Sequence, residues 1–208
     1  MTETITRKTL LSVGAIEECE AMEWFGETYP DGVALADELI ERLAADDELR
    51  GFLGWLVTHY PGLTPAQVDA CIAGTNAYGC ERIASGCKDL TDEQISACIA
   101  GTDANGRHWI VSVCKDLTDE QISACIAGTD TYGRARIAIN REDLTNEQVS
   151  ACIAGADADG CARIAEERKD LTDEQRALCE GAEGGGGVGG GVGGGVGGGE
   201  GGGDGGRL

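Results

Sequence analysis

The sequence predicts an all-α protein built around an α-solenoid of four full and one partial two-helix repeats. Leucines and cysteines return with a constant 27-residue period, two sets of glycines keep the same interval, and no insertion breaks the register. Helices too short to bury an apolar face alone need at least ~3 stacked copies, which this chain has. The repeated positions are Leu63, Leu90, Leu117, Leu144 and Leu171; Cys71, Cys98, Cys125, Cys152 and Cys179; Gly74, Gly101, Gly128 and Gly155; Gly79, Gly106, Gly133 and Gly160.

Each repeat opens with a signal for the start of a helix. Thr91 is followed three residues later by Gln94, the pattern of a capping box in which the two side chains satisfy each other's backbone N–H groups. Asp92 and Glu93 fall in the first turn, where the helix dipole favours negative charge. The same pattern recurs at Thr118 and Gln121, Thr145 and Gln148, and Thr172 and Gln175, while Thr64-Pro65 supplies it in the first copy.

The rest of the repeat predicts a second helix. Ile95, Cys98 and Ile99 have the spacing of one apolar helical face. Gly101 is typical of a helix end, and the second helix begins after Thr102-Asp103. The glycine set that begins at Gly79 falls early in the second helix. A missing side chain there would allow close helix packing, although a role in a turn stays open.

The two ends do not carry the repeat. Residues 1–61 are predicted to form an N-terminal helical cap with helices at 4–13, 16–28, 33–45 and 47–59, because the first repeat exposes an apolar flank that must be covered. Residues 62–183 hold the repeats. Residues 184–208 are rich in glycine and are predicted to be disordered. The aromatic core expected in the cap consists of Trp24, Phe25, Phe52 and Trp55.

The repeat pattern Leu-Thr-x-Glu-Gln, followed by Ile-Ala-Gly and a second Gly-Arg, resembles the short HEAT-like and leucine-rich-variant helical repeats of bacterial and phage proteins. The segments Glu23-Trp24-Phe25, Tyr29-Pro30-Asp31-Gly32 and Gly54-Trp55-Leu56 resemble a small helical module of unassigned function from the same sources. The resemblance implies a bacterial or phage protein and a scaffold for binding. It implies no activity, and it assigns no residue roles.

Composition restricts the function. The formal net charge is −21 and the isoelectric point is near 4.2, so the chain repels polyanions and should not bind nucleic acid directly. The sequence has no secretory signal and no apolar run of the ~18 residues that a membrane span needs. A cytoplasmic location is therefore expected, in which the cysteines remain thiols.

Catalytic and metal-binding patterns are missing from the sequence. The cysteines show no Cys-x-x-Cys pair, and His59 and His108 offer no paired ligand spacing. The abundant carboxylates are explained by helix starts, and no nucleophile elbow occurs. We therefore expect no enzyme activity, no cofactor and no metal.

A protein partner is expected instead, because the repeats vary where the fold does not dictate the residue. Aromatic and arginine side chains, which are favoured at interface hot spots, occupy variable positions at the start of the second helix. The alternative is that these positions are ordinary solvated ones and that Trp109 fills the core between repeats. The candidate partner-binding residues are Tyr78, Arg82, Arg107, Trp109, Tyr132, Arg134, Arg136 and Arg163.

Three functions fit these features. The first is a non-enzymatic protein-interaction scaffold. The second is an acidic mimic of nucleic acid that inhibits a DNA- or RNA-binding host protein, which requires carboxylates ordered along one surface. The third is a structural assembly component that uses the glycine-rich tail.

Overall fold

The computed structural model of the chain describes residues 4–12, 20–34 and 37–184. Within these ranges the chain is helical apart from one pair of two-residue strands, so the all-α prediction is confirmed with that exception. The glycine-rich segment predicted to be disordered lies outside the described ranges from residue 185 onward.

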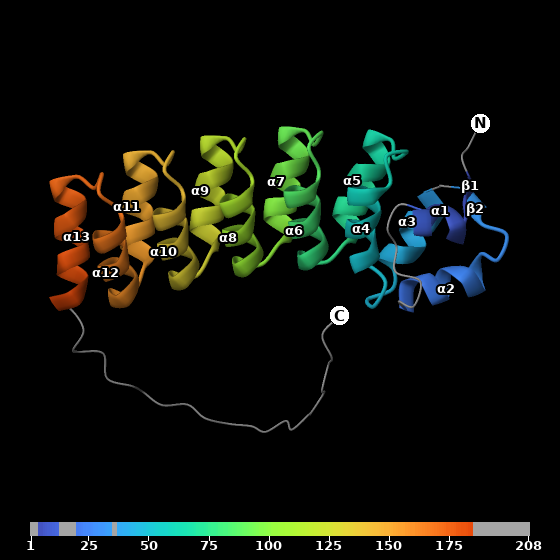
Figure 1. Cartoon of the computed structure of the whole chain (residues 1–208), viewed down its shortest axis with the longest axis horizontal. Helices are drawn as coiled ribbons and strands as arrows, with labels where there is room; N and C mark the ends of the chain where they lie inside the picture. The colour runs from blue at the N-terminus through green and yellow to red at the C-terminus, as the bar shows by residue number, and fades with distance from the viewer. Residues whose placement is uncertain (1–3, 13–19, 35–36, 185–208) are drawn as a thin grey trace, which may run out of the picture.

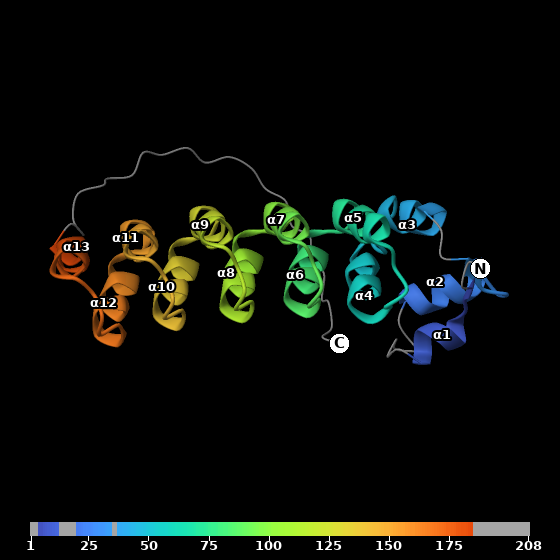
Figure 2. The same ribbon diagram turned by 90° about the horizontal axis from the view of Figure 1, so that it is seen from above.

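Two rows of helices form the body of the molecule (Figures 1 and 2). One row contains the first helix of each repeat, and each of these helices contacts the next one in its row; the second helices do the same. The first helices are α5 (Pro65–Gly74), α7 (Asp92–Gly101), α9 (Asp119–Gly128), α11 (Asn146–Gly155) and α13 (Asp173–Gly184). The second helices are α6 (Ala77–Gly86), α8 (Ala104–Val113), α10 (Thr131–Asn140) and α12 (Ala158–Glu167).

Local capping explains where these helices begin. The predicted capping boxes are confirmed: the Thr118 hydroxyl accepts from the Gln121 N–H at 3.2 Å, and the Gln121 side chain accepts from the Thr118 N–H at 3.0 Å. Each second helix is capped by a single Asp or Asn side chain, as where Asp103 accepts from the Gly106 N–H at 2.8 Å. The equivalent caps of the other second helices are Asn76, Asp130 and Asp157.

The core consists of small and branched side chains. The repeated cysteines are at most 1% exposed. The isoleucine that follows each one is buried at Ile72, Ile99, Ile126 and Ile153. In the last helix this position is Glu180, which is exposed. The outer flank of α13 is therefore polar at the point where every earlier first helix has an isoleucine.

Buried polar side chains join one repeat to the next. The Gln121 amide group donates to the Asp92 carbonyl oxygen at 3.0 Å and reaches the Ser96 hydroxyl at 3.3 Å. On the second row, the Thr102 hydroxyl donates to the Ala77 carbonyl oxygen at 3.0 Å. A Cβ at Gly106 would lie 2.0 Å from that hydroxyl oxygen. The glycine early in this second helix is therefore required by the threonine beside it.

The N-terminal part differs from the prediction in its secondary structure. Helices were expected over 4–13 and 33–45, and both expectations are wrong at their first residues, where β1 (Thr4–Ile5) pairs antiparallel with β2 (Val33–Ala34). Gly32, with φ of 84°, directs the chain back toward β1, and a Cβ there would lie 2.6 Å from the Ile5 carbonyl oxygen. Only glycine fits this left-handed, crowded position.

The N-terminal helices are also shorter than expected. They are α1 (Arg7–Ser12), α2 (Glu20–Thr28), α3 (Asp37–Ala44) and α4 (Gly51–His59). The start of the predicted helix 16–28 lies outside the described residues. The predicted helix 47–59 begins late, because the Asp46 carboxylate accepts from the Glu48 N–H at 2.9 Å and holds a turn. Phe25 is buried as expected, and Trp24, Phe52 and Trp55 pack against the same cluster.

Helices α3 and α4 make the contacts of a repeat. They contact α5 and α6, respectively, as each repeat contacts the next. The Thr75 hydroxyl donates to the Arg50 carbonyl oxygen at 2.9 Å, and Arg50 stands one repeat length before Ala77, the acceptor of the next link. The predicted boundary between residues 61 and 62 therefore lies between two units that pack in the same way.

Candidate protein interface

Exposed aromatic side chains gather along the second row of helices. Tyr78 on α6 is 59% exposed, Trp109 on α8 is 49% exposed and Tyr132 on α10 is 56% exposed. Tyr78 and Tyr132 occupy the same position two repeats apart, and Trp109 lies one helical turn beyond that position in the repeat between them. The expectation that Trp109 fills the core between repeats is therefore wrong.

Arginines accompany the two tyrosines. The Arg82 guanidinium lies 5.8 Å from the centre of the Tyr78 ring, and Arg136 has the same distance to the Tyr132 ring. Each pair is four residues apart and so shares one helical face. Arg163 on α12 is exposed at the position of Arg82 and pairs with Glu167 at 3.4 Å. We call the face formed by Tyr78, Arg82, Trp109, Tyr132, Arg136 and Arg163 the aromatic face.

Arg107 and Arg134, which were also candidate residues, lie elsewhere. The Arg107 Nε donates to the Ile99 carbonyl oxygen at 3.0 Å, and Arg134 donates to the Thr129 and Ala127 carbonyl oxygens at 3.3 Å. Both are half-buried. Their guanidinium groups lie where a Cβ on the first helix of the next repeat would stand, at Gly128 and Gly155. These two arginines join helices to one another and do not contribute to the aromatic face.

His108 supports the aromatic face from beneath. Its ring meets the Tyr132 ring edge-on with 6.4 Å between centres, and the residue is 8% exposed. Burial lowers the pKa of His108, the nearby Arg136 lowers it further, and Asp130 opposes the shift. The imidazole is therefore neutral at physiological pH.

Trp55 was predicted only as a core residue of the cap, and its place in the row of second helices was missed. It stands one repeat length before Arg82, on α4. Its ring stacks on Phe52 at 5.0 Å and on His59 at 4.8 Å. The matching register was available as a signal. It was overlooked because residues before 62 lack the repeated leucine and glycines.

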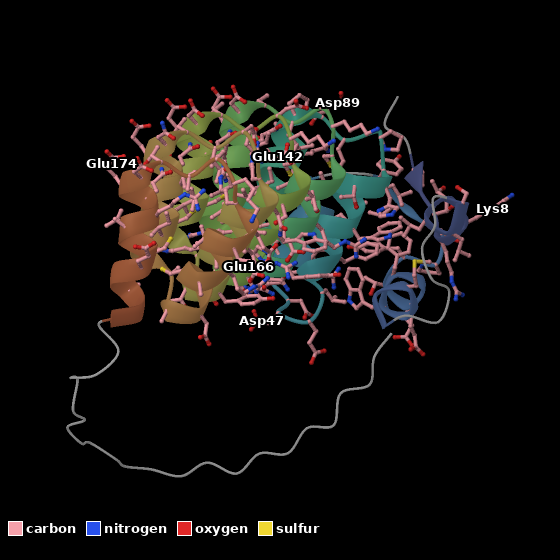
Figure 3. The ribbon with its side chains drawn as sticks, turned by 60° about the vertical axis from the view of Figure 1, so that its left-hand side comes forward. Lys8, Asp47, Asp89, Glu142, Glu166 and Glu174 are labelled. Atoms are coloured by element: carbon pink, nitrogen blue, oxygen red, sulfur yellow. The ribbon has the colours of Figure 1, made fainter. Side chains whose placement is uncertain are left out.

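A separate set of carboxylates lies on a different part of the surface. Asp89, Glu142 and Glu174 are found along one edge, where the first helices begin (Figure 3). In the second repeat this edge carries Lys88, Asp89, Asp92 and Glu93, a net charge of −2 from one base and three acids. The aromatic-face arginines are on the other row of helices, so they do not interrupt this edge.

Three of the repeated cysteines in the described part of the chain are buried and unreactive. The nine cysteines of the described ranges are free thiols. Burial raises the pKa of Cys71, Cys125 and Cys152 to about 12, which keeps each thiol protonated and unreactive. Within those ranges, no three His, Cys, Asp or Glu side chains come together as metal ligands.

Comparison with known proteins adds no further identification. No family model, curated protein or solved structure matches the chain. Among the described helices, none has the length and apolar character required to cross a membrane.

Proposed function

We propose that this chain is a non-enzymatic, cytoplasmic α-solenoid of HEAT-like repeats that binds a protein partner through the aromatic face. The observation that carries the proposal is the exposure of Tyr78, Trp109 and Tyr132 on consecutive second helices. Tyr, Trp and Arg are the residues most enriched among interface hot spots. Stacked helices also present such residues on one extended surface.

The size of the exposed aromatic area supports a binding role. A half-exposed aromatic side chain leaves roughly 100 Å² in water, and covering it contributes about 2.5 kcal/mol. The three rings together therefore contribute about 7 kcal/mol before the cost of association is subtracted. This is the scale of a specific contact anchored by a few residues.

The test compares two triple variants of the full chain. One carries Tyr78→Ala, Trp109→Ala and Tyr132→Ala; the other carries Glu93→Ala, Glu120→Ala and Glu147→Ala on the acidic edge. A partner captured from the native host is purified, and its Kd for each variant is measured by calorimetry. We expect the aromatic variant to weaken binding by roughly 100-fold or more with an unchanged Tm. An unchanged Kd for that variant would reject the proposal.

A second candidate is a mimic of nucleic acid, which the row of carboxylates along the acidic edge favours. The charge density of this edge weighs against the mimic: the net charge of −2 beside the start of α7, over a helix spacing of roughly 9 Å, is about one charge per 4–5 Å. Duplex DNA carries one charge per ~1.7 Å. The triple variant of Glu93, Glu120 and Glu147 distinguishes the mimic from the scaffold. If it loses the partner and binding falls steeply with added salt, the mimic replaces the scaffold.

A further inference from the structure

One position in the turn that follows each second helix changes its chemistry along the chain. The residues at this position, one repeat length apart, are Tyr60, Cys87, Cys114, Arg141 and Arg168. Arg141 is 7% exposed and is held by backbone carbonyl oxygens of the preceding repeat. It donates to those of Val111 at 2.8 Å, Cys114 at 2.6 Å and Lys115 at 3.0 Å.

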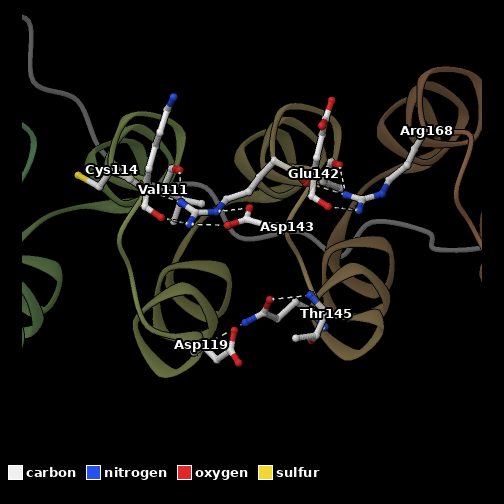
Figure 4. A network of polar contacts seen from close by, with 11 residues as sticks. Val111, Cys114, Asp119, Glu142, Asp143, Thr145 and Arg168 are labelled. Atoms are coloured by element: carbon white, nitrogen blue, oxygen red, sulfur yellow. Dashed lines mark hydrogen bonds and ion pairs between the residues drawn. The ribbon is translucent and has the colours of Figure 1, made fainter.

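An aspartate completes this guanidinium site. Asp143, two residues after Arg141, accepts from its Nε at 2.8 Å and from its Nη2 at 3.1 Å. The next repeat builds the same site: Arg168 donates to the carbonyl oxygens of Ala138, Arg141 and Glu142, and pairs with both oxygens of Asp170. Figure 4 shows the two sites side by side. Three carbonyls and one aspartate thus form a repeated receptor for a planar, forked cation.

The positions that form this receptor recur around Cys87, where no arginine is present. Val57, Tyr60 and Pro61 stand two repeat lengths before the three acceptors of Arg141, and Asp89 stands two repeat lengths before Asp143. The register is confirmed by the Cys87 thiol, which donates to the Val57 carbonyl oxygen at 3.5 Å. A cavity of about 530 Å³ opens here, and it is lined by all five of these residues.

We propose that this cavity binds the guanidinium group of a ligand, which occupies the place that Arg141 and Arg168 occupy in their own repeats. The ligand's guanidinium donates to the carbonyl oxygens of Val57, Tyr60 and Pro61 and pairs with the Asp89 carboxylate. Leu63, Val68 and Leu90 also line the cavity and cover the aliphatic stem that such a ligand carries. The cavity volume lies within the usual range for small-molecule sites. This site is separate from the aromatic face and does not depend on the proposed function.

The test measures backbone amide chemical shifts of the ¹⁵N-labelled full chain during titration. The probe is N-acetyl-arginine amide, with N-acetyl-lysine amide as the control for charge and N-acetyl-citrulline amide as the control for shape. We expect saturable shifts confined to residues 57–60 and 86–91, with Kd on the order of 1 mM for the arginine probe. Both controls should bind at least about tenfold more weakly, because neither provides a charged fork.

Variants of the receptor sharpen the test. Cys87→Arg supplies the guanidinium from within, so it should abolish binding and raise Tm by about 3 °C. Asp89→Asn should weaken binding about tenfold, whereas the neighbouring Glu93→Gln, which removes the same charge outside the cavity, should leave Kd unchanged. Equal binding of the lysine or citrulline probe, shifts elsewhere in the chain, or undiminished binding to Cys87→Arg or Asp89→Asn would each overturn the proposal.

A final arm identifies the source of the guanidinium. Agmatine represents a free small molecule, and the amide-capped probe represents an arginine side chain of a polypeptide. Tighter binding of agmatine supports a metabolite-like ligand, and equal or tighter binding of the capped probe supports an arginine of a partner protein.

Discussion

The earlier and later repeats differ in the residue that follows each second helix, although their backbones follow the same course. Cys87 and Cys114 each donate one hydrogen bond to a carbonyl of the preceding repeat, at 3.5 and 3.2 Å. Arg141 and Arg168 each bond to three such carbonyls and to an aspartate. Repeats therefore stack without the arginine, because glutamine links join successive repeats in both halves. The arginine adds local stability to the later half.

The largest expected effect on stability comes from removing one of these arginines. Arg141→Ala leaves three carbonyls of the preceding turn without their donor, and we expect it to lower the free energy of unfolding by about 3 kcal/mol. The matched Cys114→Ala removes one weak donor at the same position, and it should cost about 1 kcal/mol. Urea denaturation followed by circular dichroism measures both values. Equal losses would show that the two halves do not differ as described.

A smaller effect is expected at the glutamine links, which have the same geometry in two adjacent repeats. The Gln148 amide group donates to the Asp119 carbonyl oxygen at 3.0 Å, and its oxygen caps the Thr145 N–H (Figure 4). Gln148→Ala should lower the free energy of unfolding by about 2 kcal/mol, and so should Gln121→Ala one repeat earlier.

The exposed neighbour Glu147 serves as the control, since Glu147→Ala should change stability by no more than about 0.5 kcal/mol. The same denaturation experiment applies. A large difference between the two glutamine variants would mean that these links are not equivalent along the row.

The smallest effect concerns pH and the junction of the two halves at His108. Its pKa is lowered in the folded chain, chiefly by burial and also by Arg136, so the unfolded chain takes up the proton more readily. His108 therefore destabilises the fold once the pH drops below 6.5, the ordinary value for an unfolded histidine. His108→Gln should remove part of the decrease in Tm between about pH 7.5 and about pH 5.5. An identical decrease in the variant and the parent chain would assign the pH dependence to other groups.

The sequence predicted those features that arise from local chemistry. Thr118 and Gln121 are three residues apart and cap one helix, so their roles can be read without knowing what surrounds them. The roles of side chains that contact other helices were harder to predict from the sequence. Arg107 and Arg136 are both arginines on second helices, yet one bonds to a backbone carbonyl and the other lies over an aromatic ring. The neighbouring residues in space decide this difference, and they belong partly to other helices.

Some missed features did leave a signal in the register. Trp55 lies one repeat length before Arg82, and an aspartate follows two residues after Cys87, Cys114, Arg141 and Arg168 alike. Residues 37–60 lack the leucine, the capping threonine and the paired glycines, so the fold of α3 and α4 rests on packing that the sequence pattern does not display. The pairing of β1 with β2 depends on the turn at Gly32, a tertiary contact that no periodicity reveals.

The carboxylate at Glu180 has a consequence for how copies of this protein behave toward one another. A molecule whose last helix offered the isoleucine found in the earlier units could accept the next molecule end to end, and heterologous contacts of that kind form filaments. Desolvating a charge at the join opposes this growth. Two charged side chains on α13, Glu180 in place of the repeated isoleucine and Arg176 in place of the apolar residue at Val68 and Ile95, therefore oppose the end-to-end addition of a second molecule.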